Sequence, residues 1–261
     1  MKALFFDFDG TIISPKTHQI DDAVVERMKE LKDKGYLLFL NTGRSKAILD
    51  SRIYDLPFDG YILSCGCYVM FKNDVVYHTE INHKLSSDLI RWLNELDIEG
   101  FLEGEHCLYY SDNLTDDRML FHLNNYKVNG VDLKQTSQYS CSYPFEKLFI
   151  HFKSLENKSN FVKQISSYFD FIDRGNDCAE LVPLGHSKGT GIDIIVNLCG
   201  LNIDDCYAFG DSANDIDMFK KVSNSALIGS GETKGLEQYV SFVAPDVDHL
   251  GLIKALDYFK L

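Results

Sequence analysis

The stretch Asp7-Phe8-Asp9-Gly10-Thr11 decides the fold, because it places two carboxylates directly after a short apolar run, Ala3-Leu4-Phe5-Phe6. A continuous apolar run of this length predicts a buried strand in a parallel sheet that is covered on both faces. Like charges two residues apart resist joint ionisation at the end of such a strand. A bound cation, or a chemical role for a proton on one of them, would offset the repulsion. The sequence therefore predicts a metal-assisted carboxylate site at the end of the first strand.

The composition of the whole chain is that of a soluble globular protein. The chain has 261 residues, of which 45% are hydrophobic and 25% charged, enough for one large domain or two medium ones. The net charge of −13 argues against a nucleic-acid partner and against an anionic membrane surface. No apolar run approaches the ~20 residues of a membrane helix. We expect neither nucleic acid nor membrane as a partner.

The seven cysteines fit no disulfide framework. Because the predicted first strand lies at the very start of the sequence, we expect no cleaved leader. Reduced thiols are typical of the cytosol. We therefore expect a cytoplasmic protein, either a monomer or a weak homodimer.

Strands and helices alternate on both sides of a middle section of different character. The middle section, 82–184, has short aromatic strands and amphipathic helices, which predicts an α+β domain with its helices on one face of an antiparallel sheet. The flanking segments, 1–81 and 185–261, predict one α/β domain with a Rossmann-like parallel sheet, interrupted by that second domain. In the flanking segments we expect strands at 36–40, 60–64 and 207–209, and helices at 21–34, 45–54, 188–198 and 213–221.

Four polar clusters lie at predicted strand ends or helix starts, where open α/β sheets bind their ligands. Any one cluster could be an ordinary turn or a helix cap. Lys188 is harder to explain in that way, because a cation at a helix N-terminus opposes the helix dipole. The clusters are Asp7 with Asp9, Thr42 with Gly43 and Arg44, Lys188, and Asp211 with Ser212, Asn214 and Asp215.

The chemistry that needs this set of groups is phosphoryl transfer through an aspartyl phosphate. A carboxylate is a suitable nucleophile toward phosphorus. A hard cation with oxygen ligands, most plausibly Mg²⁺, would offset the carboxylates and the phosphate together. A lysine, a hydroxyl and backbone N–H groups would hold the phosphoryl oxygens. A second carboxylate would protonate the leaving oxygen and then deprotonate water.

In this ordered set the chain resembles the haloacid dehalogenase superfamily, and within it the Cof-like phosphatases with a large inserted α+β cap domain. The resemblance covers the full length and identifies 82–184 as the cap and 1–81 with 185–261 as the catalytic core. Four motifs carry it: Asp7-Phe8-Asp9-Gly10-Thr11, Thr42-Gly43-Arg44, Ser187-Lys188-Gly189 and Gly210-Asp211-Ser212-Ala213-Asn214-Asp215.

The resemblance implies a role for each matching residue. Asp7 would be the nucleophile and a metal ligand, and Asp9 the general acid/base, whose backbone carbonyl also binds the metal. Mg²⁺ would be held by Asp7, Asp9, Asp211 and Asp215. The phosphate would be bound by Thr42, Gly43, Lys188 and Asn214. Candidate substrate contacts are Arg44 in the core, and Arg174 and Asn176 in the cap.

One departure from the family pattern lies after the third strand, where Cys65-Gly66-Cys67 replaces the usual Asn-Gly-Ala. The role of position 65 is left open. We expect a Mg²⁺-dependent phosphatase of a small phosphorylated metabolite, with a sugar phosphate first, then pyridoxal phosphate and FMN. A phosphomutase of the same fold and a non-catalytic phosphometabolite-binding protein are the alternatives. The fold does not select a substrate.

Overall fold

The computed structural model describes residues 1–111, 114–136, 143–229 and 235–261. Contacts within the chain divide it into two units. The core unit comprises 1–43, 50–78 and 186–261, and the inserted unit comprises 44–49 and 79–185. The segment 44–49, expected in the core from the sequence, belongs by its contacts to the inserted unit.

The core unit is built on a sheet that has eight strands in the described part of the chain, in the order β14-β13-β12-β1-β2-β3-β4-β5. β1 (Ala3–Phe6) lies at its centre, between β12 (Cys206–Gly210) and β2 (Leu37–Asn41). The pairs from β14 to β3 are parallel, and β4 and β5 extend the sheet in antiparallel fashion. The predicted α/β class with a Rossmann-like parallel sheet is confirmed. The remaining strands are β3 (Gly60–Leu63), β4 (Tyr68–Phe71), β5 (Asp74–His78), β13 (Asn224–Ile228) and β14 (Phe242–Ala244).

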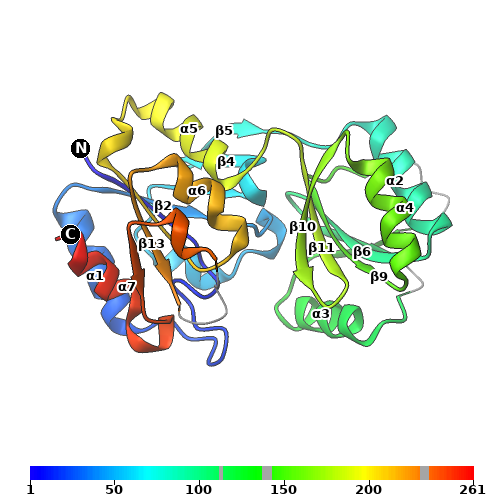
Figure 1. Ribbon diagram of the computed structural model, residues 1–261, viewed down its shortest axis with the longest axis horizontal. Coiled ribbons are helices and arrows are strands. Elements are labelled where there is room, and N and C mark those ends of the chain that lie inside the picture. The colour runs from blue at the N-terminus through cyan, green and yellow to red at the C-terminus, as the bar shows by residue number, and fades with distance from the viewer. Residues whose placement is uncertain (112–113, 137–142, 230–234) are drawn as a thin grey trace. The chain divides into compact units, whose positions relative to one another are not determined.

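Two pairs of helices accompany this sheet. α5 (Lys188–Cys199) contacts α6 (Ile216–Lys221), and α1 (Asp22–Asp33) contacts α7 (Gly251–Tyr258) (Figure 1). Alternate residues of β1 are buried toward α5 and α6, where Phe5 shares one apolar cluster with Ile192 and Met218. The core of this unit therefore fixes the start of α5 against the central strands.

The predicted helix at 45–54 is wrong. The structure has two short 3₁₀ helices there, Lys46–Ile48 and Ser51–Asp55. Leu49 is extended, and the side chain of Asp50 accepts a hydrogen bond from the N–H of Arg52, which begins the second turn anew. A capping carboxylate inside the apolar pattern thus ends one turn and starts another.

The inserted unit has a six-stranded sheet in its described residues, in the order β10-β11-β9-β6-β7-β8. Its strand pairs are antiparallel except β7 with β8, which run parallel. None of the helices in the described residues of either unit is long and apolar enough to cross a bilayer. The strands are β6 (Ile98–Glu103), β7 (Leu108–Ser111), β8 (Leu133–Thr136), β9 (Lys147–Phe152), β10 (Phe169–Gly175) and β11 (Cys178–Pro183). The helices are α2 (His83–Glu95), α3 (Asp117–Val128) and α4 (Leu155–Ile165).

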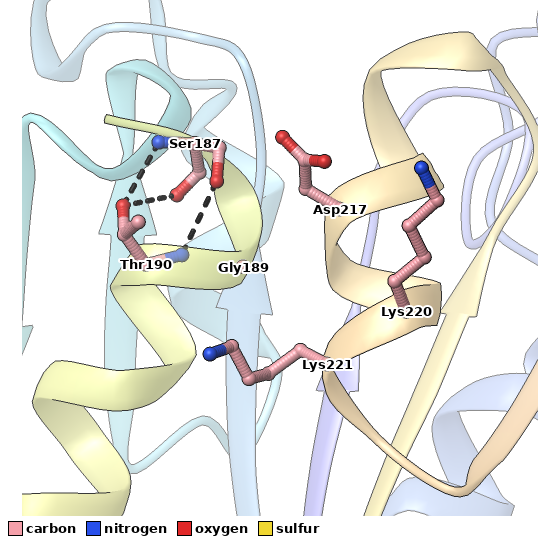
Figure 2. Close-up of a pocket in the computed structure, with 6 residues that line it drawn as sticks. All are labelled: Ser187, Gly189, Thr190, Asp217, Lys220 and Lys221. Carbon is pink, nitrogen blue, oxygen red and sulfur yellow. Dashed lines mark hydrogen bonds between the residues drawn. The ribbon is translucent and has the colours of Figure 1, made fainter. Parts of the chain in front are cut away.

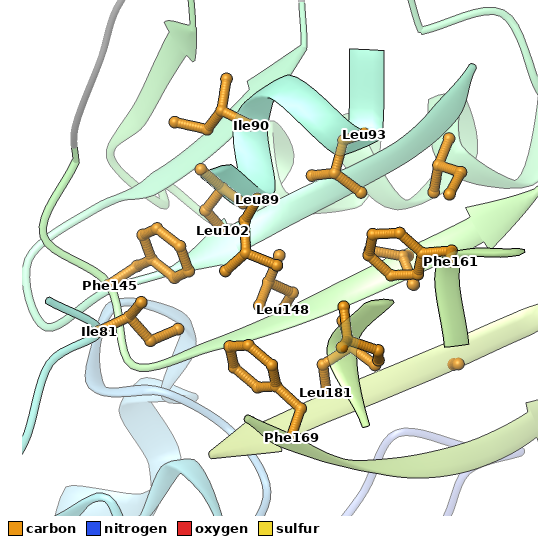
Figure 3. Close-up of a cluster of buried hydrophobic side chains, with 14 of the residues drawn as sticks. Ile81, Leu89, Ile90, Leu93, Leu102, Phe145, Leu148, Phe161, Phe169 and Leu181 are labelled. Atoms are coloured by element: carbon orange, nitrogen blue, oxygen red, sulfur yellow. The ribbon is translucent and has the colours of Figure 1, made fainter. Parts of the chain in front are cut away.

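Both faces of the inserted sheet carry helices. On one face Leu89 of α2 and Phe161 of α4 are buried together with Leu148 of β9 (Figure 3). On the other face Met119 of α3 is buried with Phe101 of β6, whose neighbour Leu102 belongs to the first cluster. The prediction that the helices lie on one face is therefore wrong for α3. Side chains alternate along a strand, and the apolar residues on both sides of β6 indicate a strand covered twice.

Candidate active site

The ends of three neighbouring strands bring the predicted site residues of the core together. Asp7 follows β1, Asp211 follows β12 and Thr42 follows β2. The strands are parallel and in register, with Phe6 opposite both Phe209 and Leu40. The N–H of Asp7 donates to the carbonyl of Phe209 at 2.8 Å. The acidic motifs therefore meet at the carboxyl edge of the sheet, beside the central strand where the strand order changes direction.

Lys188 connects two of the carboxylates. Its Nζ lies 2.6 Å from Oδ1 of Asp7 and 2.5 Å from Oδ1 of Asp215. The lysine side chain is fully buried, and the residues that it joins are 181 and 27 positions away in the sequence. A buried ammonium requires charged or polar acceptors, and here both are carboxylates.

The start of α5 sets the direction of Lys188. Ser187 caps the helix, because its hydroxyl accepts from the N–H of Thr190 at 3.2 Å while the Thr190 hydroxyl accepts from the N–H of Ser187 at 2.9 Å (Figure 2). This reciprocal cap fixes the first turn, so Lys188 is held as the first helical residue. The two carboxylates offset the unfavourable position of a cation at a helix N-terminus.

A surface pocket of about 450 Å³ lies beside this turn (Figure 2). Its lining comes from Ser187, Gly189 and Thr190 at the start of α5 and from Asp217, Lys220 and Lys221 of α6, and the side chain of Lys221 extends toward α5. Lys221 is engaged with Asp193 at 2.6 Å. The buried carboxylates of Asp7 and Asp215 are not among the residues that line this pocket.

The loop after β12 orients Asp215 through both of its oxygens. Oδ2 accepts from the backbone N–H groups of Asp211 at 2.9 Å and Ser212 at 3.0 Å, while Oδ1 faces Lys188. The hydroxyl of Ser212 donates to Oδ1 of Asn214 at 2.9 Å, which places that amide in the same loop. Asp215 is thus buried, and hydrogen bonds from the loop backbone fix the orientation of its carboxylate.

Burial dominates the electrostatics of the carboxylates. It raises the pKa of Asp7 to about 7, with Lys188 opposing the rise and Asp215 and Asp9 adding to it. Burial likewise raises the pKa of Asp211 to about 8, and the charges of Asp7 and Asp215 add to the effect. Burial acts to lower the pKa of Lys188, but Asp215 and Asp7 outweigh it and hold that pKa above its usual value. The nearby negative charge therefore exceeds what one ammonium balances.

The same carboxylates are suited to a metal ion. Asp7, Asp211 and Asp215 each offer an oxygen, and these oxygens all lie within 4.8 Å of one another. Hard cations such as Mg²⁺ prefer such a set of carboxylate oxygens. The excess negative charge at buried positions is what a divalent ion would neutralise. Asp9 stands apart from this set in one respect, because its side chain is exposed.

The remaining predicted residues fall into two groups. Thr42 is buried at the end of β2, where its N–H donates to the carbonyl of Ile62 at 2.9 Å, and Gly43 follows it. Arg44 belongs by its contacts to the inserted unit, and its guanidinium donates to the carbonyl of Ile48 at 3.3 Å.

Arg174 and Asn176 share the hairpin between β10 and β11 in the inserted unit, and both are exposed. Nε of Arg174 lies 3.3 Å from Oε1 of Glu180, and the carbonyl of Asn176 accepts from Arg118. Asn176 has a φ of +50°, the left-handed conformation of a turn. Their proposed contact with a substrate stays a prediction.

Asn41 is a further polar residue of this region, and it lies outside the four sequence motifs. The side chain of Asn41, the last residue of β2, donates to the backbone carbonyl of Lys188 at 3.0 Å. The only local signal is a polar residue ending the run Leu37-Leu38-Phe39-Leu40. That signal does not name a partner 147 positions away.

The chain is similar to known proteins over most of its length. A family model described as haloacid dehalogenase-like hydrolase matches residues 4–256. The Bacillus subtilis (strain 168) protein YkrA, named provisionally as a phosphatase, is 24% identical over 98% of this chain and 96% of its own length. An HMP-PP phosphatase of Yersinia pseudotuberculosis is 24% identical over 86% of this chain and 82% of its own length.

Solved structures show the same architecture over the whole chain. The sugar phosphatase BT4131, of haloacid dehalogenase subclass IIB, superposes with a TM-score of 0.86 at 25% identity, and covers 100% of this chain and 99% of that one. The match of the family model spans nearly the full sequence, including all four motifs. The chain therefore belongs to the haloacid dehalogenase-like hydrolase family.

Proposed function

We propose that this protein is a Mg²⁺-dependent phosphatase that hydrolyses a small phosphorylated metabolite through a phosphoaspartate on Asp7. The observation that carries the proposal is the buried contact of Lys188 with Asp7 and Asp215, beside carboxylates grouped closely enough to hold a metal. The relatives named as phosphatases support the reaction class.

In the first step a carboxylate oxygen of Asp7 attacks phosphorus, and the bond from phosphorus to the alcohol oxygen breaks. Asp9 gives its proton to the departing oxygen, so the alcohol leaves neutral. The ammonium of Lys188 and the groups at Thr42 and Asn214 hold the phosphoryl oxygens while charge is redistributed among them.

In the second step Asp9, now ionised, takes a proton from water, and the water oxygen attacks the phosphorus of the phosphoaspartate. The bond from phosphorus to Asp7 breaks, inorganic phosphate leaves and Asp7 is a free carboxylate again. The exposed position of Asp9 favours this role, because its side chain can meet both an alcohol and a water molecule.

Asp7, Asp211 and Asp215 would hold the Mg²⁺ ion, with the backbone carbonyl of Asp9 as a further ligand. When bound, the ion supplies positive charge that offsets the carboxylates and the phosphoryl group. Lys188 then has a separate task, which is to keep Asp7 ionised and aimed at phosphorus.

For the substrate we propose a sugar phosphate, and for residues 82–184 the role of a cap that contacts its leaving group. Support comes from the sugar phosphatase BT4131, which matches over the whole chain, inserted unit included. The HMP-PP phosphatase shows that a relative of similar identity is named for a different substrate. A substrate panel is therefore the first experiment.

The panel compares phosphate release from sugar phosphates, pyridoxal phosphate, FMN and p-nitrophenyl phosphate, with Mg²⁺ and with a chelator. We expect Mg²⁺-dependent release that is fastest with sugar phosphates. Activation by a sugar bisphosphate with little phosphate release would instead indicate a phosphomutase. Binding without any release would indicate a phosphometabolite-binding protein.

The covalent route has its own test. Acid quenching during turnover of a ³²P-labelled substrate should leave label on the peptide that contains Asp7, and hydroxylamine should release it as expected of an acyl phosphate. Asp7→Asn should lose both label and turnover by several orders of magnitude. Asp9→Asn should slow turnover by about 10²- to 10⁴-fold. Near-normal turnover in Asp7→Asn would remove Asp7 as the nucleophile.

A further inference from the structure

We infer that Asn41 is a positioning residue for the reaction: it ties the strand end that carries Thr42 to the helix turn that carries Lys188. The inference rests on the proposed function, since it assigns Asn41 a task in aiming Lys188. Asn41 itself belongs to none of the four motifs.

The contact joins two elements of the core unit that are distant in sequence. Asn41 is the last residue of β2 and Lys188 is the first residue of α5. Nδ2 of Asn41 lies 3.0 Å from the backbone oxygen of Lys188, and the Asn41 side chain is completely buried. The helix thus receives a hydrogen bond at the residue whose side chain reaches Asp7.

The chemistry of the neighbours fixes the orientation of the amide. Besides the carbonyl of Lys188, Nδ2 faces the sulfur of Met218 at 3.4 Å, and both neighbours are acceptors. A flipped amide would place its oxygen against two acceptors, so the nitrogen belongs on this side. The amide oxygen, Oδ1, is then buried with no hydrogen-bond partner among the residues that the structure describes.

An unpaired buried acceptor destabilises the fold, and an apolar side chain of the same size would avoid it. Stability alone therefore does not explain an amide at this place. What the amide provides is a donor to the first carbonyl of α5, with the sulfur of Met218 as its second acceptor. A buried polar atom without a partner is a locally unfavourable feature, and such features are expected beside functional sites, where the position of a side chain matters more than stability.

The surroundings leave this helix turn little freedom. Asn41 is opposite Ile62 in the pairing of β2 with β3, and α5 approaches Ile62 so closely that a Cβ on Gly191 would lie 2.3 Å from its Cγ2. Nζ of Lys188 meets its two carboxylates at 2.6 and 2.5 Å. A shift of the first turn would therefore move the ammonium relative to Asp7.

The test is Asn41→Leu, which keeps the size and removes both the donor and the unpaired oxygen. Three quantities are measured with the full chain: kcat and KM for p-nitrophenyl phosphate with Mg²⁺, the inhibition constant of inorganic phosphate, and the melting temperature. We expect kcat to fall by about ten- to a hundredfold, phosphate to inhibit more weakly, and the melting temperature to stay unchanged or rise.

Asn224→Leu is the matched control. The Asn224 amide also donates to backbone carbonyls, those of Asp204 at 2.9 Å and Cys206 at 3.3 Å, but at the opposite end of the strands. It should leave kcat within about twofold of the wild type. Asn41→Ser and Asn41→Ala form a second pair of nearly equal size, in which the serine, with a hydroxyl donor, should keep more of kcat.

If kcat of Asn41→Leu stays within about twofold of the wild type, the inference about Asn41 is wrong. Turnover by the wild type would still support the proposed function in that case. An equal loss of kcat in Asn224→Leu also overturns it. If the wild type shows no turnover, the proposed function fails. In that case weakened binding of inorganic phosphate by Asn41→Leu, measured by calorimetry, would still support the positioning of Lys188, and unchanged binding would refute it.

Discussion

The ammonium of Lys188 lies 2.6 Å from Oδ1 of Asp7, and both side chains are buried. Removing two opposite charges from water is favourable only when their geometry is good and when their remaining hydrogen-bond donors and acceptors also have partners. Asp215 accepts a second hydrogen bond from the lysine, with its Oδ1 at 2.5 Å from Nζ of Lys188. The pair is therefore part of a balanced set, and the loss of one member affects the others.

Lys188→Met should destabilise the protein as well as inactivate it. The substitution leaves the buried carboxylates of Asp7 and Asp215 without their cation, and breaking a buried ion pair in this way costs about 3–5 kcal/mol. Denaturant unfolding of the metal-free protein measures the change. The double variant Lys188→Met, Asp215→Asn should regain part of that stability and none of the activity. An unchanged free energy of unfolding in the single variant would contradict the account of the site.

Mg²⁺ should stabilise the protein more at high pH than at low pH. The pKa values of Asp7 and Asp211 are raised from 3.8 to about 7 and about 8. At a pH between 3.8 and these raised values, the folded state therefore holds protons that the unfolded state has released. The free energy of unfolding without metal must then fall as the pH rises through this window. A cation binds the ionised carboxylates and offsets the loss.

Melting curves with and without Mg²⁺ at about pH 6 and about pH 8.5 check this expectation, with Asp211→Asn as the comparison. The wild type should gain more from Mg²⁺ at the higher pH, and the variant should show a smaller gain at both. The difference between the two proteins reports the contribution of Asp211 together with its electrostatic effect on Asp7 and Asp215. An equal gain in the variant would exclude Asp211 as a ligand.

Much of the site could be predicted because its residues lie where local sequence is informative. Asp7 follows a fully apolar strand, and Lys188 follows Ser187, whose side chain caps its helix. Parallel strands bring their carboxyl ends to one edge, so the motifs could be expected to meet without knowledge of the strand order. The family resemblance then supplied the roles, which the sequence pattern alone leaves open.

The parts that could not be predicted depend on contacts between distant residues. The tie from Asn41 to the carbonyl of Lys188 needs the packing of α5 on β2, which no local pattern encodes. The apolar positions at 45–54 suited a helix, but Asp50 caps a new turn in their midst. The place of α3 on the second face of its sheet depends on Phe101 and Leu108, whose burial only the assembled unit decides.

Gly210→Ala should disturb the proposed metal site through Asp215. A Cβ on Gly210 would lie 2.4 Å from Cγ of Asp215 and 2.5 Å from its Oδ2, so the carboxylate would have to move. Overpacking of this kind costs about 1–3 kcal/mol. We expect a lower affinity for Mg²⁺, seen as a higher Mg²⁺ concentration for half-maximal activity.

Gly200→Ala is the control for this substitution. Gly200 has a φ of +61° at the end of α5, and a Cβ there would meet nothing within 4 Å. It should lower the stability by about 1 kcal/mol through backbone strain and leave the Mg²⁺ dependence unchanged. If both variants shift the Mg²⁺ dependence equally, the effect of Gly210 is one of general stability and not of the site.

Arg174→Ala tests whether the hairpin of the inserted unit reads the substrate. Arg174 is exposed and its Nε lies 3.3 Å from Oε1 of Glu180, a buried carboxylate whose other oxygen accepts from Lys147 at 2.8 Å and so keeps a cation when the arginine is removed. If the guanidinium contacts the leaving group, KM should rise by about tenfold for the preferred sugar phosphate and stay unchanged for p-nitrophenyl phosphate, because a contact of about 1.4 kcal/mol is lost only for the former. Lys158→Ala, which removes an ion pair at 3.1 Å with Asp173 on the same hairpin, is the control and should alter neither KM.

The ratio of kcat/KM between the two substrates is the quantity to compare, since it cancels any loss of folded protein. A ratio that is the same in the wild type and in Arg174→Ala would remove this arginine from the substrate contacts.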